Sequence, residues 1–244
     1  MLEPFAPAIA AAPAKCNRLL AALAPEELET MLPWLEPVRL APREVLYQPG
    51  VDIQHVYFPT SGAVSMIVLA PEGAVEVGSV GNEGFTGVCT LLFADAMPMR
   101  AIVQADGHAY RMKVGIFRAL VGESLSMRRL FSRYTLVLSN QAAQTVACNR
   151  LHSLEERCAR WLLLSHDRVE GDQIVLTQEF LSYMLGVHRP AVTLAAGTLQ
   201  KAGLIHCSRG RIEITNRPGL EQASCTCYQE MRDDFDQLVS PSAA

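Results

Sequence analysis

The sequence lacks several features that are diagnostic of particular classes of protein. It has no apolar run of the about 18 residues that a bilayer-spanning helix needs, so we predict no membrane segment. Charged residues make up only 19% of the 244 residues and the net charge is −4, so no overall basic surface points to nucleic acid. Hydrophobic residues reach 50%, which argues against an intrinsically disordered chain. One large or two small globular domains are therefore expected.

Ligand patterns for metals and disulfides are also missing. The seven cysteines are odd in number and scattered, which suits a reducing cytoplasm better than a disulfide framework. Cys225 and Cys227 stand close together without partners nearby in the sequence, and we interpret them as structural. His55 and His108 form no His-x-His pair, and the acidic residues of the same region are scattered without a base or ligand partner. We therefore predict no catalytic residue, no metal site and no cofactor.

The first residues, MLEPFAPAIAAAPAK, are apolar and end in small residues, so a secretory signal has to be considered. They contain no basic residue before Lys15, they carry Glu3, and three prolines interrupt them. These features favour a mobile N-terminal tail over residues 1–23 and a cytoplasmic protein.

Residues 24–115 show the sequence pattern of a β-rich domain. After a short helical segment at residues 24–35, short β-branched or alternating segments follow one another, and Gly or Pro interrupts them at regular intervals. This spacing favours an antiparallel roll, sandwich or barrel over a parallel sheet, and we place the roll at about residues 38–114. The fold class is therefore α+β, with an antiparallel β-roll or jelly roll first and mainly helical segments after it.

Residues 116–148 lack proline and predict a long helix. Spacings of three and four bring one set of large apolar residues to a single face, namely Met127, Phe131, Tyr134 and Leu138. A second apolar row lies beside that face, so the helix needs two partners. One interpretation buries the helix within a single subunit. The other, which we favour, pairs it through this face with its own copy in a two-fold dimer.

Two helical patterns meet in LTQEFLSYMLGVHRPAVTLAAGTLQKAGLI, residues 176–205. Thr177 can cap the first helix, Gly186 suits the left-handed residue that ends it, and Pro190 is tolerated only in the first turn of the second helix. Small apolar residues in the second helix allow the two helices to cross closely. This arrangement of helix, tight turn and helix predicts a helix-turn-helix.

A basic hairpin follows the second helix. LIHCSRGRIEIT predicts two short strands around Ser208-Arg209-Gly210, and residues 186–217 carry five Lys or Arg against one Glu, so positive charge gathers here. Together these segments predict a winged helix-turn-helix domain over residues 153–244 that binds double-stranded DNA. An ordinary pair of helices with solvated surface arginines is the alternative.

The predicted DNA contacts fall on both helices and on the hairpin. Arg189 can make a bidentate contact to guanine, whereas the hairpin arginines would meet phosphates, which supply affinity and register but no sequence information. The predicted DNA-binding residues are Thr177, Gln178, His188, Arg189, Pro190, Thr193, Arg209 and Arg211.

With these parts in order, the chain resembles the Crp/Fnr family of bacterial transcription regulators from about residue 20 onward. The likeness is strongest at LTQEFLSYMLGVHRPAV, LQKAGLI and RGRIEI. It is looser at PGVDIQHVYFPTSGAVSM and VGNEGFTGV, which look like early strands and the phosphate-binding region of the family's cyclic-nucleotide-type sensor roll. The resemblance places Arg189 where the family has a base-reading arginine. Pro190 and Leu194 stand where the family often has polar readers, which implies a different operator.

The resemblance also implies an effector pocket, with a Gly-Glu element for a ribose and an Arg followed by a small residue for a phosphate. The nearest equivalents in this chain are Gly81, Glu83, Gly84, Arg100 and Ala101. Ala101 lacks the hydroxyl that Ser or Thr would donate, so cyclic AMP is not the expected effector. An oxygen-sensing iron–sulfur cluster would need several cysteines near the N-terminus, where only Cys16 lies.

We therefore expect a non-enzymatic, cytoplasmic and homodimeric transcription regulator. Its roll senses an unknown small molecule, residues 116–148 dimerise, and the C-terminal domain reads an inverted repeat. RNA polymerase is a further candidate partner. An effector would change the angle of the DNA-binding domain about a hinge near residue 153. The alternative function is a ligand-binding or protein-interaction module of the same fold without sequence-specific DNA binding.

Overall fold

The computed structural model describes residue 14 and residues 16–239. Most of the predicted N-terminal tail lies outside this part of the chain, but its end is packed rather than mobile. Helix α2 (Arg18–Ala21) buries Leu19 and Leu20 completely. Asn17 is also buried, and its side-chain amide donates to the carbonyls of Pro59 and Gly84. The prediction of a tail up to residue 23 is therefore wrong for residues 17–23, which contribute to the core.

The antiparallel β-roll is confirmed. Two sheets, with strand orders β1-β7-β3 and β2-β6-β4-β5, pair in antiparallel register throughout. Short helical segments precede the roll, namely α3 (Pro25–Met31) and the 3₁₀ turn η1 (Leu32–Trp34), and a second 3₁₀ turn, η2 (Val88–Leu92), interrupts it. The strands are β1 (Glu36–Leu40), β2 (Val45–Tyr47), β3 (His55–Pro59), β4 (Ala63–Ala70), β5 (Gly73–Val80), β6 (Arg100–Ala105) and β7 (Gly107–Lys113).

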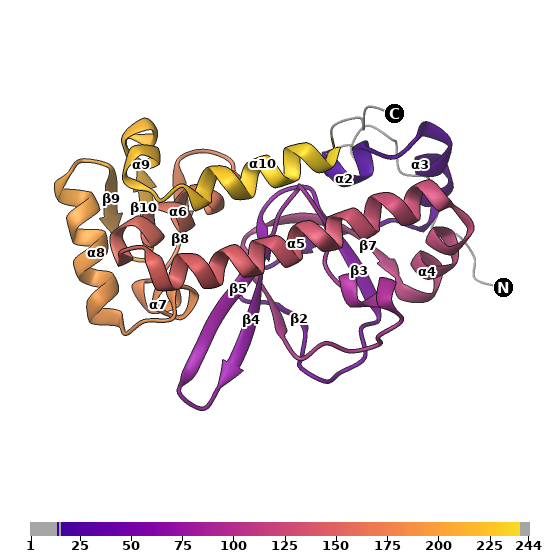
Figure 1. The fold of residues 1–244 in the computed structure, drawn as a ribbon, viewed down its shortest axis with the longest axis horizontal. Coiled ribbons are helices and arrows are strands. Elements are labelled where there is room, and N and C mark those ends of the chain that lie inside the picture. Colours follow the sequence, from indigo (N-terminus) through magenta and orange to yellow (C-terminus); the bar gives the residue numbers. More distant parts are fainter. Residues whose placement is uncertain (1–13, 15, 240–244) are drawn as a thin grey trace.

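The predicted long helix is divided in two. Helix α4 (Val114–Glu123) ends before Ser124, whose backbone is extended, and α5 (Leu125–Leu151) begins after it. The Ser124 hydroxyl oxygen accepts the backbone N–H of Met127 at 3.2 Å, so this residue caps α5 instead of continuing one helix. The break lets α4 and α5 fold back against the same side of the roll (Figure 1).

One face of α5 completes the core of its own roll. Phe131 lies 5.3 Å from Phe85 and 5.2 Å from Phe117 between ring centroids, and Tyr134 lies 5.5 Å from Phe85. Met127, Phe131 and Tyr134 are at most 2% exposed. Burying side chains of this size contributes about 1.5–3 kcal/mol each. Three of the four residues predicted to dimerise are therefore enclosed within the subunit, because the roll supplies the aromatic surface that this face needs.

The C-terminal half has its own apolar core. Helix α6 starts at a capping box in which the Ser153 hydroxyl oxygen accepts the N–H of Glu156, while the Glu156 carboxylate accepts the N–H of Ser153. The wing has three strands in the order β8-β10-β9, of which β8 was not predicted. The elements are α6 (Leu154–His166), β8 (Gln173–Val175), α7 (Gln178–Leu185), α8 (Arg189–Lys201), β9 (Ile205–Ser208), β10 (Arg211–Ile214), α9 (Arg217–Ala223) and α10 (Cys227–Val239).

Helix α10 runs back along α5 and joins the two halves of the molecule (Figure 1). The Asn140 amide of α5 donates to the Asp234 carboxylate at 3.3 Å, and Arg133 donates to the carbonyl of Gln237. At its far end, Asp236 pairs with Arg18 of α2 at 2.6 Å. The C-terminal segment therefore returns from the C-terminal half of the molecule to the N-terminal helices.

A buried hydrogen-bond chain connects α6 to the roll. The indole N–H of Trp161 donates to one carboxyl oxygen of Glu76 at 3.1 Å, and the Ser65 hydroxyl lies 2.5 Å from the other oxygen and 2.9 Å from the Gln104 carbonyl. The Gln104 amide in turn donates to Ser165. Ser65 has one proton for these two oxygens, so a protonated Glu76 that donates to the Ser65 hydroxyl oxygen leaves the Ser65 proton for the Gln104 carbonyl. Burial raises the pKa of Glu76 to about 7, in agreement with this arrangement.

The raised pKa of Glu76 predicts a pH-dependent stability. Because the pKa of about 7 in the folded protein exceeds the usual value of 4.5 for a glutamate, protonation of Glu76 stabilises the fold at low pH, and this stabilisation is lost as pH rises through 7. Glu76→Gln keeps a donor toward Ser65 and cannot ionise. Urea unfolding measures the free energy of unfolding of both proteins. Between pH 5 and pH 8, that of the variant should rise by about 3 kcal/mol relative to that of the wild type.

Glu72→Gln, at an exposed position of the same hairpin, serves as the control and should follow the wild type at every pH. If Glu76→Gln also ran parallel to the wild type, Glu76 would be ionised throughout and the hydrogen-bond chain would be assigned wrongly.

Candidate DNA-binding site

The helix-turn-helix is built by the local signals read from the sequence. The Thr177 hydroxyl oxygen accepts the N–H of Phe180 at 3.1 Å and caps α7. Gly186 has a φ of +63° and ends α7 in the left-handed conformation. His188 is the N-cap residue of α8, followed by Arg189 and Pro190 in its first turn. The tight turn therefore directs the first turn of α8 away from the core.

Helix α8 separates a buried stripe from an exposed one. Val192, Ala195, Ala196 and Leu199 are at most 3% exposed and pack toward α6 and α7. The exposed residues of α8 are Arg189, Pro190, Thr193, Leu194, Thr198, Gln200 and Lys201. Helix α8 lies at the end of the molecule away from α3 and α4 (Figure 1). A helix with one free polar face at the outside of a domain can enter the major groove of DNA.

Gln178 and Thr193 link the two helices of the motif. The Thr193 hydroxyl lies 2.8 Å from the side-chain oxygen of Gln178 and 3.1 Å from the carbonyl of Arg189. The structure thus brings these two predicted DNA contacts together on one surface. Thr177 is half-buried and faces a pocket between α7 and the roll.

The wing presents its arginines from a tight turn. Gly210 has a φ of +69°, and its carbonyl accepts the N–H of Leu176, which fixes the β9–β10 hairpin to the start of α7. Arg209 and Arg211 are exposed on either side of Gly210. Within the described residues, no ion pair holds Arg189, Arg209 or Arg211. Their charges are therefore available to a negatively charged partner.

Arg217, the fifth basic residue of the positive stretch, has a structural position instead. Its guanidinium pairs with Asp167 at 2.6 Å and with Glu221 at 3.0 Å, and it donates to the Tyr228 hydroxyl at 2.6 Å. These contacts hold α9 against the end of α6. The charge that faces outward comes from α8 and the hairpin, so the local excess is smaller than the sequence indicates.

The residues proposed for an effector pocket are not brought together. Glu83 pairs with Arg168 of the α6–β8 loop at 2.6 Å and accepts the N–H of Gly81. Arg100 lies opposite Ile67 in the sheet, whereas the turn containing Glu83 begins after Val80, which lies opposite Val64. These positions are separated by about 10 Å along β4. Arg100 donates to Gln48, and Ala101 is completely buried. Glu83 and Arg100 therefore line separate cavities.

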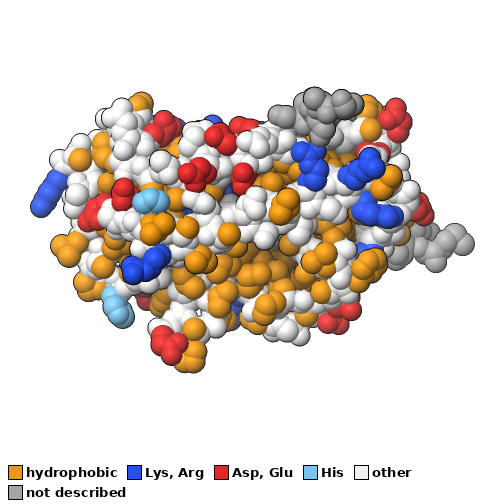
Figure 2. All heavy atoms as spheres, viewed as in Figure 1, with side chains coloured by type: hydrophobic (Ala, Val, Ile, Leu, Met, Phe, Trp, Pro, Cys, Tyr) orange, Lys and Arg blue, Asp and Glu red, His pale blue; other side chains and the backbone are white. Residues whose placement is uncertain are grey.

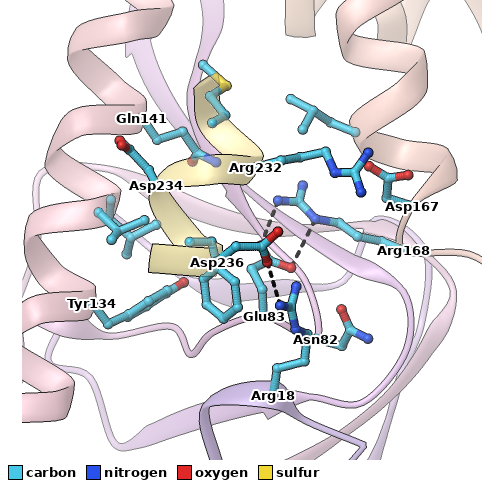
Figure 3. A pocket seen from close by; sticks show the side chains of 15 residues that line it. Arg18, Asn82, Glu83, Tyr134, Gln141, Asp167, Arg168, Arg232, Asp234 and Asp236 are labelled. Atoms are coloured by element: carbon cyan, nitrogen blue, oxygen red, sulfur yellow. Dashed lines mark hydrogen bonds and ion pairs between the residues drawn. The ribbon is translucent and has the colours of Figure 1, made fainter. Parts of the chain in front are cut away.

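Two cavities lie between the halves of the molecule. One, of about 440 Å³, is enclosed by α5, α10, the turn at Asn82 and Glu83, and Arg168. Figure 3 shows Glu83 and Arg168 paired in this cavity beside Tyr134. The other, of about 400 Å³, contains Arg100 of the roll together with Thr177, Phe180 and Tyr183 of α7. Arg168 was missed by sequence analysis because nothing in its neighbourhood links a loop arginine to a glutamate 85 residues earlier.

The comparisons with known proteins agree with this architecture. The cyclic nucleotide-binding domain matches residues 37–124, and the Crp-like helix-turn-helix domain matches residues 156–223. No curated protein matches the chain significantly in sequence. Among the described residues, no helix is long and apolar enough to cross a membrane.

Several solved structures share the fold. A transcriptional regulator of the Crp/Fnr family from Eubacterium rectale has a TM-score of 0.67 at 16% identity, over 86% of this chain and 98% of that one. A CRP-family regulator from Thermus thermophilus has a TM-score of 0.64 at 20% identity, over 77% and 96%. CLP, the c-di-GMP responsive global regulator of Xanthomonas campestris, has a TM-score of 0.61 at 18% identity, over 78% and 99%.

An N-terminal sensor-type roll, a long helix and a winged helix-turn-helix, in this order, define a DNA-binding transcription regulator. The two domain matches cover more than half of the chain, and their order is that of the solved regulators with the same fold. The chain belongs to the Crp/Fnr family of transcription regulators.

The turn of the motif generates a prediction on stability. A Cβ at Gly186 would lie 2.9 Å from Val75 Cγ2 of the roll, and its φ of +63° is unfavourable for any side chain. Gly186→Ala should therefore lower the free energy of unfolding by about 2 kcal/mol, as measured by urea unfolding.

The matched control is Gly197→Ala within α8, where a Cβ meets nothing within 4 Å. That substitution should raise stability by about 0.5–1 kcal/mol, since alanine favours a helix over glycine. Equal effects of the two substitutions would show that the turn is not held against the roll.

Proposed function

We propose that the protein binds DNA as a homodimer and reads an inverted repeat, with α8 of each subunit in the major groove. The observation that carries the proposal is the exposed first turn of α8, with the two wing arginines free of ion pairs among the described residues. A cationic helix start and a basic hairpin on one domain match the base-edge and phosphate contacts of winged helix-turn-helix proteins.

Arg189 is the residue we assign to base reading. It occupies the first position of α8, where recognition helices approach base edges, and its planar guanidinium matches the two acceptors of guanine. Leu194, one turn further along the exposed side, is 73% exposed and suits contact with a thymine methyl group. Arg209 and Arg211 contact phosphates and position the domain.

The second face of α5 supplies the dimer contact. A row of exposed residues continues along it at alternating spacings of three and four: Ser132, Leu136, Ser139, Ala143 and Val146. Leu136 is 61% and Val146 69% exposed, so both apolar side chains are available for contact with a second copy of α5. Figure 2 shows hydrophobic side chains gathered across the middle of this side of the molecule. The spacing is that of a two-stranded coiled-coil seam, so two copies of α5 can pair along it.

The sensor roll works with an effector other than cyclic AMP. Glu83 already pairs with Arg168, Ala101 is buried, and Arg100 faces a different cavity. An effector would act by changing how the DNA-binding domain sits on the roll, and hence whether both copies of α8 reach the grooves. The proposed binding to DNA, with RNA polymerase as a further candidate partner, places the action of the protein in the cytoplasm under this proposal.

Selection of random duplex DNA by the full chain without added ligand tests the proposed function directly. An enriched inverted repeat, with half-site centres about 10 base pairs apart, supports a dimeric reader that needs no effector. Absence of enrichment, both alone and with cell extract, would contradict sequence-specific binding and favour an interaction module of the same fold.

Arg189→Ala should weaken binding to the selected repeat by about 1–3 kcal/mol and leave binding to random DNA almost unchanged, because only a base contact is lost. Fluorescence anisotropy at several salt concentrations measures both affinities. Arg209→Ala is the control, since loss of a phosphate contact should weaken both DNAs alike and reduce the salt dependence by about one charge. An equal loss on both DNAs for Arg189→Ala would exclude base reading by this residue.

Leu136→Glu should convert the dimer to a monomer, because two like charges would face each other in the proposed seam. Light scattering after gel filtration measures the change from twice the chain mass to the chain mass. Leu92→Glu, at a similarly exposed leucine outside α5, should remain dimeric. A dimer unaffected by Leu136→Glu would place the contact elsewhere.

A further inference from the structure

Four metal-ligating side chains meet where α5, α9 and α10 come together. Cys148 and His152 lie at the end of α5, and Cys225 and Cys227 lie in the connection between α9 and the start of α10. The sulfur atoms of Cys148 and Cys225 are 3.5 Å apart, as are the sulfur of Cys227 and Nδ1 of His152. All four ligand atoms lie within 4.8 Å of one another.

The geometry and chemistry of this cluster match one zinc ion. Tetrahedral coordination with Zn–S bonds of 2.3 Å separates neighbouring sulfurs by about 3.8 Å, so the observed spacing needs only small adjustments. Three thiols and one imidazole form a ligand set used by structural zinc sites, and sulfur ligands disfavour calcium and magnesium. The ligand atoms converge on one point, which leaves no room for a cluster of several metal ions.

The electrostatic surroundings point independently to a negatively charged centre. Arg157 and Arg160 of α6 are less than 10% exposed, and among the described residues neither forms an ion pair. The Nε atom of each is buried without a hydrogen-bond partner. Both lie in the first two turns of α6, which begins directly after His152 and Ser153. One zinc ion with three thiolates carries a net charge of −1, which would offset part of this buried positive charge.

The thiols also have a polar neighbour suited to metal ligands. The side-chain amide of Gln144, one turn before Cys148 on α5, donates to the sulfur of Cys227 at 3.1 Å. Such a hydrogen bond supports a thiolate and fixes its orientation. Cys148, Cys225 and Cys227 are at most 4% exposed, so solvent has little access to the sulfurs.

We propose that Cys148, His152, Cys225 and Cys227 bind one zinc ion that fastens α10 and the DNA-binding domain to the end of α5. His152 directly precedes Ser153, where α6 begins, so the ion would sit at the junction between the two halves. Cys225 and Cys227 connect α9 of the DNA-binding domain with α10. The ion would thus hold the end of α5 against the connection between α9 and α10.

The sequence contains the four zinc ligands in two separate short patterns. Cys-x-x-x-His at the end of one helix and Cys-x-Cys before another are each too short to indicate a site. Cys148 of the first pattern and Cys225 of the second are 77 residues apart in the sequence. The two patterns meet only because the chain returns along α5.

The test begins with the full chain purified under reducing conditions. Metal analysis should find one zinc per chain. After removal of zinc by a chelator in the presence of reductant, addition of cobalt(II) should produce the absorption bands of tetrahedral thiolate-bound cobalt, and zinc should abolish them. Thermal unfolding of the wild type should shift to lower temperature when zinc is removed and return when it is added.

Variants assign the ligands. Cys148→Ser and Cys227→Ser should lose the cobalt bands, whereas Cys16→Ser and Cys207→Ser, at cysteines outside the cluster, should keep them. His152→Cys should retain binding with an added thiolate contribution to the spectrum, which separates ligation by residue 152 from a purely structural role. Because the cobalt titration of the wild type does not depend on any variant, poor folding of a variant does not affect the main result.

Two results would overturn the proposal. The reduced wild type could hold no zinc and give no thiolate–cobalt bands, in which case the cysteines are structural or form a disulfide. Alternatively, the bands could persist in Cys227→Ser and disappear in Cys16→Ser or Cys207→Ser, which would place the metal at other residues.

Discussion

The insertion of one face of α5 into the roll is the contact on which the other arrangements depend. Phe131 and Tyr134 complete an aromatic core with Phe58, Phe85 and Phe117, so the helix cannot leave without opening the sensor domain. This fixes which side of α5 faces solvent. It also places the last turn of the helix at the boundary with the DNA-binding half, where α6 and α10 meet it.

Polar contacts then determine how the two halves sit together. Arg168 reaches from the α6–β8 loop to Glu83 and Ser79, and Trp161 reaches from α6 to Glu76. These groups are buried, so each depends on its partner more strongly than a surface pair would. Helix α7 also packs against β5 of the roll. A structural change in the roll near Glu76 or Glu83 would therefore alter the position of α6 and of the helix-turn-helix that packs on it.

The helix-turn-helix could be predicted because its signals are local. Contacts between residues far apart in the sequence could not be predicted. Thr177, Gly186 and Pro190 each act on backbone within a few residues of their own position, so their roles could be inferred from spacing alone. The apolar face of α5 was also visible, but its partner was not, because periodicity cannot distinguish the roll of the same chain from a second subunit. Arg168 with Glu83, and Cys148 with Cys225, are pairs whose members lie far apart in the sequence. Their meeting follows from tertiary packing, and β8 and the path of α10 were missed for the same reason.

The return of α10 along α5 changes the mechanics of the molecule. A domain held by a single linker can rotate about three axes, whereas this one is joined to the rest of the chain at two separated places. One is the His152–Ser153 link, and the other is the contact of α10 with α2 near Asp236. If the buried contacts of Trp161 and Arg168 with the roll were broken, these two attachments would leave rotation about the line between them as the easiest motion. The DNA-binding domain would then tilt about this single axis instead of rotating about several.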